Sequence, residues 1–264
     1  MNTQFLHQSL EAVGGPLVLV ASIVWLAAMI SLPLRDIFGR AGARESAIRH
    51  AVVAQVLLVT VLSTRFLPPL AVVRVLIGVP LLGLLVEAIG TRTGFPFGVY
   101  RYTDRLQPQL LHVPLAIPAA WLMMMPPSWA VSAALTGTSS GFAFVVVSAA
   151  AFTAWDLLLD PRMVGWGYWI WERPGRYPGG IPFTNFVGWF LAAGFITALT
   201  APHVPPPRAE LSPVLLLVLV YGIVWALETL GQAFFWRMKA SAALGGTVMG
   251  ALSLAAFFAI RRVS

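Results

Sequence analysis

The chain has 264 residues, of which 58% are hydrophobic and only 10% are charged. Soluble domains of this size do not have that composition, so the sequence predicts an all-α protein in which 1–264 form a single integral membrane domain, a polytopic bundle of about eight transmembrane helices. The chain contains no cysteine, which excludes disulfides, thiolate catalysis, iron–sulfur clusters and cysteine-ligated zinc, and its formal charge of +7 indicates contact with anionic lipid headgroups rather than with nucleic acid.

Long uncharged segments divide the chain into predicted helices. The segments without Asp, Glu, Lys or Arg are 12–34, 106–155, 177–207 and 240–260. Because a helix needs about 20 apolar residues to cross a bilayer core, each segment is long enough for at least one span. With the apolar stretches between them, they predict helices in chain order at 15–34, 47–67, 69–90, 111–135, 139–160, 183–201, 213–236 and 241–260.

The first and the fourth predicted helices differ from the rest. No basic segment precedes the first helix, so we expect it to be a retained span rather than a cleaved secretory signal. The fourth contains Pro114, Pro118, Pro126 and Pro127. Proline lacks a backbone N–H and its ring clashes with the preceding turn, so we expect this helix to be kinked or broken.

Positive charge is distributed unequally between the two sides of the predicted bundle. If the N-terminus lies outside, 12 of the 17 lysine and arginine residues fall in the inner loops. Loops rich in lysine and arginine stay in the cytoplasm, so the sequence predicts that both termini lie outside and that the loops 91–110 and 161–182 are cytoplasmic. The predicted location is the inner (plasma) membrane, crossed several times.

The stretch AWDLLLD (154–160) places Asp156 and Asp160 one helical turn apart on one face of a helix. Ionisable side chains inside a membrane are costly and usually mark a functional cavity. Two close carboxylates in a low dielectric do not both ionise easily, so we expect the pair to keep one proton, as a general acid requires. For Asp160, just before Pro161, a helix-end position at the lipid headgroups is an equally open interpretation.

Other polar and aromatic residues are predicted at the same inner end of the bundle. Glu87, Asn185 and Glu228 lie there, and Arg92 is a candidate structural partner for Glu87. The sequence around the aspartates also holds Trp155, Trp166, Trp169 and Trp171. Such rings are typical of a membrane interface, and they also suit a substrate wall that stabilises a cation.

Several stretches, in this order, resemble the membrane-integral carotenoid biosynthesis family: GFPFGVYRYT (94–103), VPLAIPAAW (113–121), AWDLLLDPRMV (154–164) with GYWIW (167–171), and YPGGIPFTNFVGW (177–189). The resemblance covers roughly residues 80–235. Members of this family, such as carotenoid 1,2-hydratases and bisanhydrobacterioruberin hydratase, hydrate the open, isoprenoid-like end of a carotenoid. The resemblance therefore implies a cofactor-independent carotenoid hydratase, which adds water across the terminal double bond of an acyclic carotenoid to give a tertiary alcohol.

Alkene hydration needs a proton donor, surroundings that stabilise a carbocation, and a positioned water molecule. We predict Asp156 as the proton donor, with Asp160 and Glu87 as the other catalytic residues. The predicted substrate-binding residues are Trp155, Tyr100, Tyr102, Trp121, Trp166, Trp169, Asn185 and Glu228. Among these, Asn185 or one of the two tyrosines is expected to hold the water.

No metal or other cofactor is expected. The four histidines are scattered along the chain, so they do not form the ligand set that an oxygen-dependent iron hydroxylase needs. The expected substrate is an acyclic carotenoid of the lycopene, γ-carotene or C50 type. Membrane lipids and other carotenoid enzymes are expected partners, and nucleic acid is not.

Two other functions remain open from the sequence. A membrane prenyltransferase of isoprenoid metabolism also uses Asp-x-x-x-Asp spacing, but its acids hold Mg²⁺ and a diphosphate and require a second acidic motif, which this sequence lacks. A non-enzymatic carotenoid-binding or transport protein would also keep acids within the membrane. The identity of the carotenoid product distinguishes the three.

Overall fold

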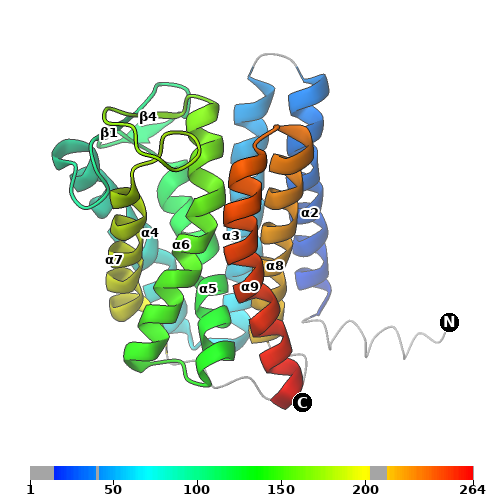
Figure 1. Ribbon diagram of the computed structural model, residues 1–264. Coiled ribbons are helices and arrows are strands. Elements are labelled where there is room, and N and C mark those ends of the chain that lie inside the picture. Colours follow the sequence, from blue (N-terminus) through cyan, green and yellow to red (C-terminus); the bar gives the residue numbers. More distant parts are fainter. Residues whose placement is uncertain (1–14, 40–41, 203–212, 264) are drawn as a thin grey trace.

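The structure is a computed structural model that describes residues 15–39, 42–202 and 213–263. The described chain forms one bundle of long helices (Figure 1). These are α2 (Gly15–Phe38), α3 (Ala43–Phe66), α4 (Pro69–Thr93), α5 (Ala116–Thr136), α6 (Gly141–Gly165), α7 (Phe183–Thr200), α8 (Pro213–Leu230) and α9 (Lys239–Val263), with a π-helical turn, η1 (Gly231–Phe235), after α8. The predicted all-α fold and the order of its eight helices are confirmed, with ends that differ by a few residues.

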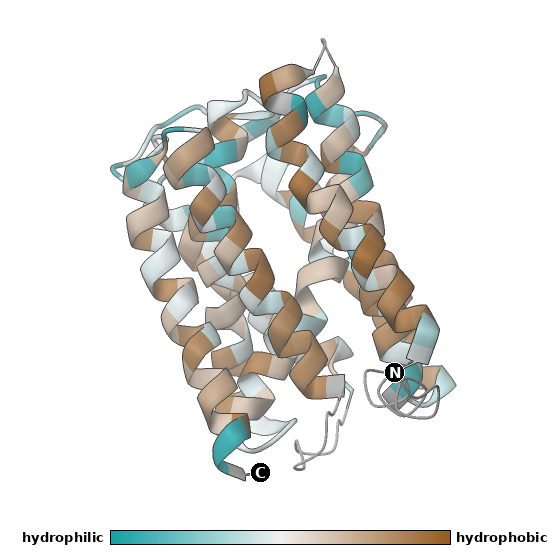
Figure 2. Cartoon of the chain, turned by 90° about the vertical axis from the view of Figure 1, so that its right-hand side faces the viewer, coloured by the Kyte–Doolittle hydropathy of each residue, from teal (hydrophilic) through white to brown (hydrophobic). Residues whose placement is uncertain are grey.

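Within the described residues, seven helices are long and apolar enough to cross a membrane, which makes the chain a multi-pass membrane protein. The eighth, α5, packs against α3, α4, α6, α8 and α9. Because these helices rather than lipid surround α5, it does not need the apolar outer surface of a lipid-facing span. Many large hydrophobic residues of the other helices are exposed on the outside of the bundle. The helices are mainly hydrophobic between their ends (Figure 2).

The proline-rich helix α5 is continuous, so the break that its prolines allowed is not observed. Pro118 lies in its first turn, where a backbone N–H has no partner within the helix. Pro126 and Pro127 lie in its interior, and Pro127 cannot donate to the carbonyl oxygen of Met123. That oxygen instead accepts a hydrogen bond from Gln55 Nε2 on α3 at 3.2 Å. A buried side chain from a neighbouring helix therefore replaces the missing helical bond.

Glycines allow α9 to pack closely against α6 and α8. A Cβ atom added to Gly245 would lie 2.9 Å from Leu158 on α6, and one added to Gly250 would lie 2.6 Å from the Trp225 ring on α8. Since lipid gives little hydrophobic drive for helix association, close backbone approach through small residues supplies much of the packing energy.

Two short strands join the connecting loops at one end of the bundle. Strand β1 (Tyr100–Tyr102) pairs antiparallel with β4 (Trp169–Trp171), so that Tyr100 lies opposite Trp171 and Tyr102 opposite Trp169. A second small hairpin consists of β2 (Gln109–Leu110) and β3 (Val113–Pro114). The β1–β4 pairing confirms that the loops 91–110 and 161–182 lie on the same side. The beginning of α2 and the end of α9 both lie at the opposite end (Figure 1).

The predicted orientation can be tested by cysteine labelling, because the native chain contains no cysteine. We expect Asp104→Cys and Arg173→Cys, both at exposed positions, to react with an impermeant maleimide only from the cytoplasmic side. Thr138→Cys, in the α5–α6 loop at the other end, is the control and should react only from outside. Labelling of positions 104 and 173 from opposite sides would contradict both the strand pairing and the topology.

Candidate active site

Glu87 on α4 is only 2% exposed, and three neutral donors surround its carboxyl group. Oε2 accepts hydrogen bonds from the hydroxyls of Tyr100 and Tyr102, the latter at 2.8 Å, and Oε1 accepts one from Trp121 Nε1 at 3.2 Å. The two tyrosines reach one carboxyl group because alternate residues of a strand face the same side. Arg92, the partner expected from the sequence, is exposed and is not among these donors.

Asp156 and Asp160 on α6 share one donor, the side-chain amide of Asn185 on α7. Asn185 Nδ2 donates to Asp156 Oδ2 at 2.8 Å and to Asp160 Oδ2 at 2.7 Å. Asp160 Oδ1 accepts a further bond from Trp169 Nε1 on β4. Asp156 Oδ1, by contrast, is buried without a hydrogen-bond partner among the described residues. The two carboxyl groups therefore differ in the number of donors that they receive.

Asp160 does not lie at a helix end near the lipid headgroups. Helix α6 continues through Pro161 to Gly165, so the predicted end at residue 160 is wrong. Asp160 is 1% exposed and Asp156 is 0% exposed. The structure thus buries both members of the pair, since β4 and α7 cover the last turns of α6.

The hydroxyls that contact Glu87 resist ionisation. Burial, together with the negative charge of Glu87, raises the pKa of both Tyr100 and Tyr102 well above the usual value. Both phenols therefore stay protonated across the physiological pH range and keep donating to the carboxyl group. Neither is available as a general base at neutral pH.

A stack of aromatic rings, called here the aromatic wall, lies beside the carboxyl groups. Trp121 and Trp189 are nearly parallel, with an interplanar angle of 8° and centroids 4.9 Å apart, and Phe152 stacks on both. Trp155 meets Phe152 and Trp189 edge-on. Gly83 leaves room for the stack, because a Cβ there would lie 2.8 Å from the Trp121 ring.

These groups enclose a small cavity of about 20 Å³, lined among others by Glu87, Asp160, Asn185, Trp169 and Trp189. The space is about that of a single water molecule rather than of an isoprenoid chain. In the described part of the chain, no group of three His, Cys, Asp or Glu side chains is arranged to hold a metal ion. The donors that contact the three carboxyl groups are all neutral.

The comparisons with known proteins identify the family to which the chain belongs. The family model described as "Carotenoid biosynthesis protein" matches residues 48–252. This range includes Glu87, Asp156, Asp160 and the side chains that donate to them, called here the acid cluster. The chain belongs to the carotenoid biosynthesis protein family. It is also 32% identical over 117 residues to bisanhydrobacterioruberin hydratase of Haloarcula japonica, a match that covers 43% of this chain and 39% of that protein. No solved structure matches.

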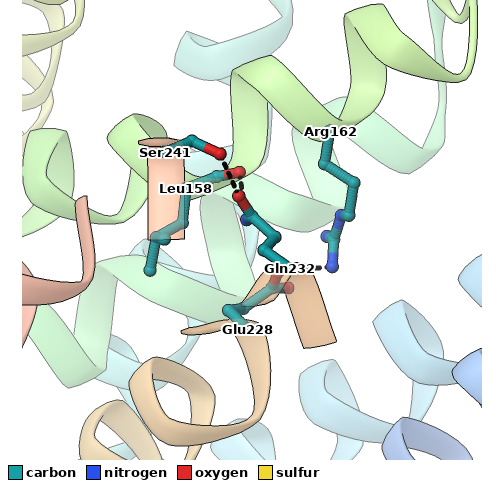
Figure 3. A network of polar contacts seen from close by, with 5 residues as sticks. All are labelled: Leu158, Arg162, Glu228, Gln232 and Ser241. Carbon is teal, nitrogen blue, oxygen red and sulfur yellow. Dashed lines mark hydrogen bonds and ion pairs between the residues drawn. The ribbon is translucent and has the colours of Figure 1, made fainter. Parts of the chain in front are cut away.

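This carotenoid biosynthesis protein contains a second buried polar cluster, and Glu228 belongs to it rather than to the acid cluster. Glu228 on α8 is paired with Arg162 on α6 (Figure 3). Close by, Gln232 of η1 donates to the backbone oxygen of Leu158 at 2.7 Å and accepts from Ser241 of α9 at 2.5 Å. The cluster thus joins α6, α8, η1 and α9, and the sequence-based grouping of Glu228 with the aspartates is not observed.

Trp166 also lies outside the acid cluster. Its ring meets Trp236 edge-on, and the guanidinium of Arg162 lies over both rings, at 5.1 Å and 5.2 Å from their centroids. The chain leaves α6 at Gly165, which places Trp166 beside Arg162 and not beside β4. The other predicted residues do meet: Glu87, Asp156, Asp160, Tyr100, Tyr102, Trp121, Trp155, Trp169 and Asn185 form the acid cluster and its aromatic wall.

Trp189 and Phe152 of the aromatic wall, and Arg162 of the second cluster, were not predicted as site residues from the sequence. Trp189 follows Asn185 by four residues, so both lie on one face of α7, and this spacing was a usable signal. Arg162 pairs with a residue 66 positions later, and no local pattern indicates such a contact.

Breaking the Arg162–Glu228 pair is expected to destabilise the protein, because a lone charge would remain buried. We expect Arg162→Met to lower the free energy of unfolding by about 3–5 kcal/mol, and the double variant Arg162→Met/Glu228→Met to recover most of that loss. Arg92→Met, at an exposed position, is the control and should have little effect. Thermal unfolding in detergent measures all three, and a double variant no more stable than the single one would contradict the pairing.

Proposed function

We propose that this protein is a carotenoid hydratase that adds water across the terminal double bond of an acyclic carotenoid and forms a tertiary alcohol. The observation that carries the proposal is the acid cluster: three buried carboxyl groups with neutral donors only, next to a stack of indole rings. Such a site suits a reaction that passes through a cation. Family membership and the hydratase among its relatives support the same reaction.

In the proposed mechanism, Asp156 donates the proton. Asp160 receives two N–H donors, which stabilise its carboxylate form, whereas Asp156 receives one and keeps Oδ1 without a partner. The π electrons of the double bond take the proton from Asp156 and form a new C–H bond at the less substituted alkene carbon. The other alkene carbon becomes a tertiary carbocation. Water then forms the C–O bond, and its released proton returns to the aspartate pair.

The groups around the carbocation can stabilise its positive charge. The carboxyl group of Glu87 is held in place by its three donors, and the faces of Trp121 and Trp189 supply electron-rich rings. Both bonds that Asn185 Nδ2 makes go to the aspartates, so Asn185 positions the acids rather than the water. The hydroxyl oxygens of Tyr100 and Tyr102 retain lone pairs that can accept from the reacting water.

The first test is substitution of the proposed donor. Asp156→Asn keeps the size of the side chain but cannot supply an acidic proton, so we expect the hydration rate to fall about 10²–10⁴-fold. Asp160→Asn should be milder, because Asp160 acts through its neighbour. Asp104→Asn, at an exposed position, is the control and should hydrate normally. Hydration by the Asp156→Asn variant at the wild-type rate would assign the proton to another group.

The second test is the source of the oxygen atom. Expression in a host that makes lycopene, followed by product analysis, should give a hydroxylated carotenoid rather than a prenylated one. With purified protein in ¹⁸O-labelled water, the label should appear in the new hydroxyl group, without oxygen gas and in the presence of a strong chelator. Activity that the chelator removes and an added metal restores would contradict a metal-independent hydration.

A further inference from the structure

The small cavity at the acid cluster cannot hold the polyene chain of a carotenoid, so most of the substrate must lie elsewhere. The cavity at the cluster is about 20 Å³, far smaller than the ligand pockets of other proteins. A long apolar polyene therefore needs an adjoining apolar space that opens toward the lipid. Two cavities in the described residues combine mainly apolar walls with a volume above 200 Å³, and they lie on different sides of the bundle.

The larger is a cavity of about 250 Å³ between α2, α3, α5, α6 and α8, called here the α2–α8 cavity. Its rim consists of half-exposed hydrophobic side chains on α2 and α8, including Ile30, Leu34 and Leu230. Helix α2 packs mainly against α3, which leaves this lateral opening. The helices on that side of the bundle are largely hydrophobic between their ends (Figure 2).

Trp155, which is 1% exposed, is one of the buried residues that line the α2–α8 cavity. Its ring contacts Phe152 and Trp189 of the aromatic wall, and the next residue in the chain is Asp156. Trp155 therefore lies between the two spaces: it lines the α2–α8 cavity and contacts Trp189, which lines the small cavity at the acid cluster. Arg162 and Glu228 also line the cavity, and their ion pair lies at the end of the bundle that carries the strands.

The second space, about 220 Å³, is a groove between α4 and α7. It is shallow, because Ile89, Phe95 and Leu191 on its walls are each half exposed or more. Phe97, 1% exposed, blocks the path from this groove inward: its ring packs edge-on against Tyr100, and a Cβ at Gly90 would lie 2.7 Å from it. The groove between α4 and α7 thus does not reach the acid cluster.

We propose that the α2–α8 cavity binds the apolar polyene chain of the substrate, which enters laterally from the lipid between α2 and α8 and places its terminal double bond past Trp155 at Asp156. The inference rests on the proposed function for the identity of the ligand. The Arg162–Glu228 pair closes the cavity on the aqueous side, so the chain remains in apolar surroundings along its length.

Two buried alanines provide a matched test. Ala51 lines the α2–α8 cavity and is 6% exposed, and Ala192 lines the groove between α4 and α7 and is 5% exposed. Each is replaced by phenylalanine in the Asp156→Asn background, which prevents turnover, and the proteins are purified from a host that makes lycopene. The amount of carotenoid retained per protein, read from visible absorbance, measures binding.

We expect the Asp156→Asn protein and its Ala192→Phe derivative to retain carotenoid, and the Ala51→Phe derivative to retain at least about tenfold less. Leu227→Trp, at a half-buried position in the same cavity, gives a second blocking variant in case Ala51→Phe does not yield a monodisperse protein. Retention by both blocked variants, or loss in Ala192→Phe alone, would overturn the proposal.

The same measurements separate this proposal from the proposed function. A wild-type protein that binds carotenoid through the α2–α8 cavity but forms no hydroxylated product would overturn hydration and leave the binding site standing. An Asp156→Asn protein that retains no carotenoid, beside a wild type that hydrates it, would overturn the binding site and leave hydration standing.

Discussion

Burial of carboxyl groups in an apolar bundle is the constraint on which the rest of this structure depends. A carboxyl group removed from water is stable only where hydrogen-bond donors or a counter-charge replace the lost hydration. Glu87, Asp156 and Asp160 receive theirs from four other elements, β1, β4, α5 and α7. These donors require two long loops to fold back over the end of the bundle, and the β1–β4 pairing holds the loops there.

The protein meets the same constraint in two chemically different ways. Glu228 has a cation beside it, Arg162, so that cluster is close to neutral and joins helices α6 and α8. The acid cluster has only neutral donors and therefore keeps its capacity to hold a proton or a negative charge. The difference explains why Glu228 and the acid cluster, at the same end of one bundle, suit different roles, one structural and one chemical.

The aromatic rings link the acid cluster to the apolar interior. Trp121, Trp189 and Phe152 stack beside the carboxyl groups, and Trp155 forms the boundary between that stack and the α2–α8 cavity. A reaction that produces a cation from a hydrocarbon needs both surroundings next to each other: polar groups at one bond and apolar walls along the rest of the chain. The helix packing around α5 brings the two together.

The sequence by itself determined the class of the fold, the order of the eight helices, and most of the acid cluster. It did so because uncharged runs of bilayer length have few alternatives to a helix, and because Asp156 and Asp160 are one turn apart in any helix. Only the tertiary structure decided the partners of each acid. Asn185 between the aspartates, the tyrosines at Glu87 and the pairing of Arg162 with Glu228 join residues that are 13 to 66 positions apart. Such contacts depend on how helices pack and how loops fold back, and those arrangements leave no periodic signal along the chain.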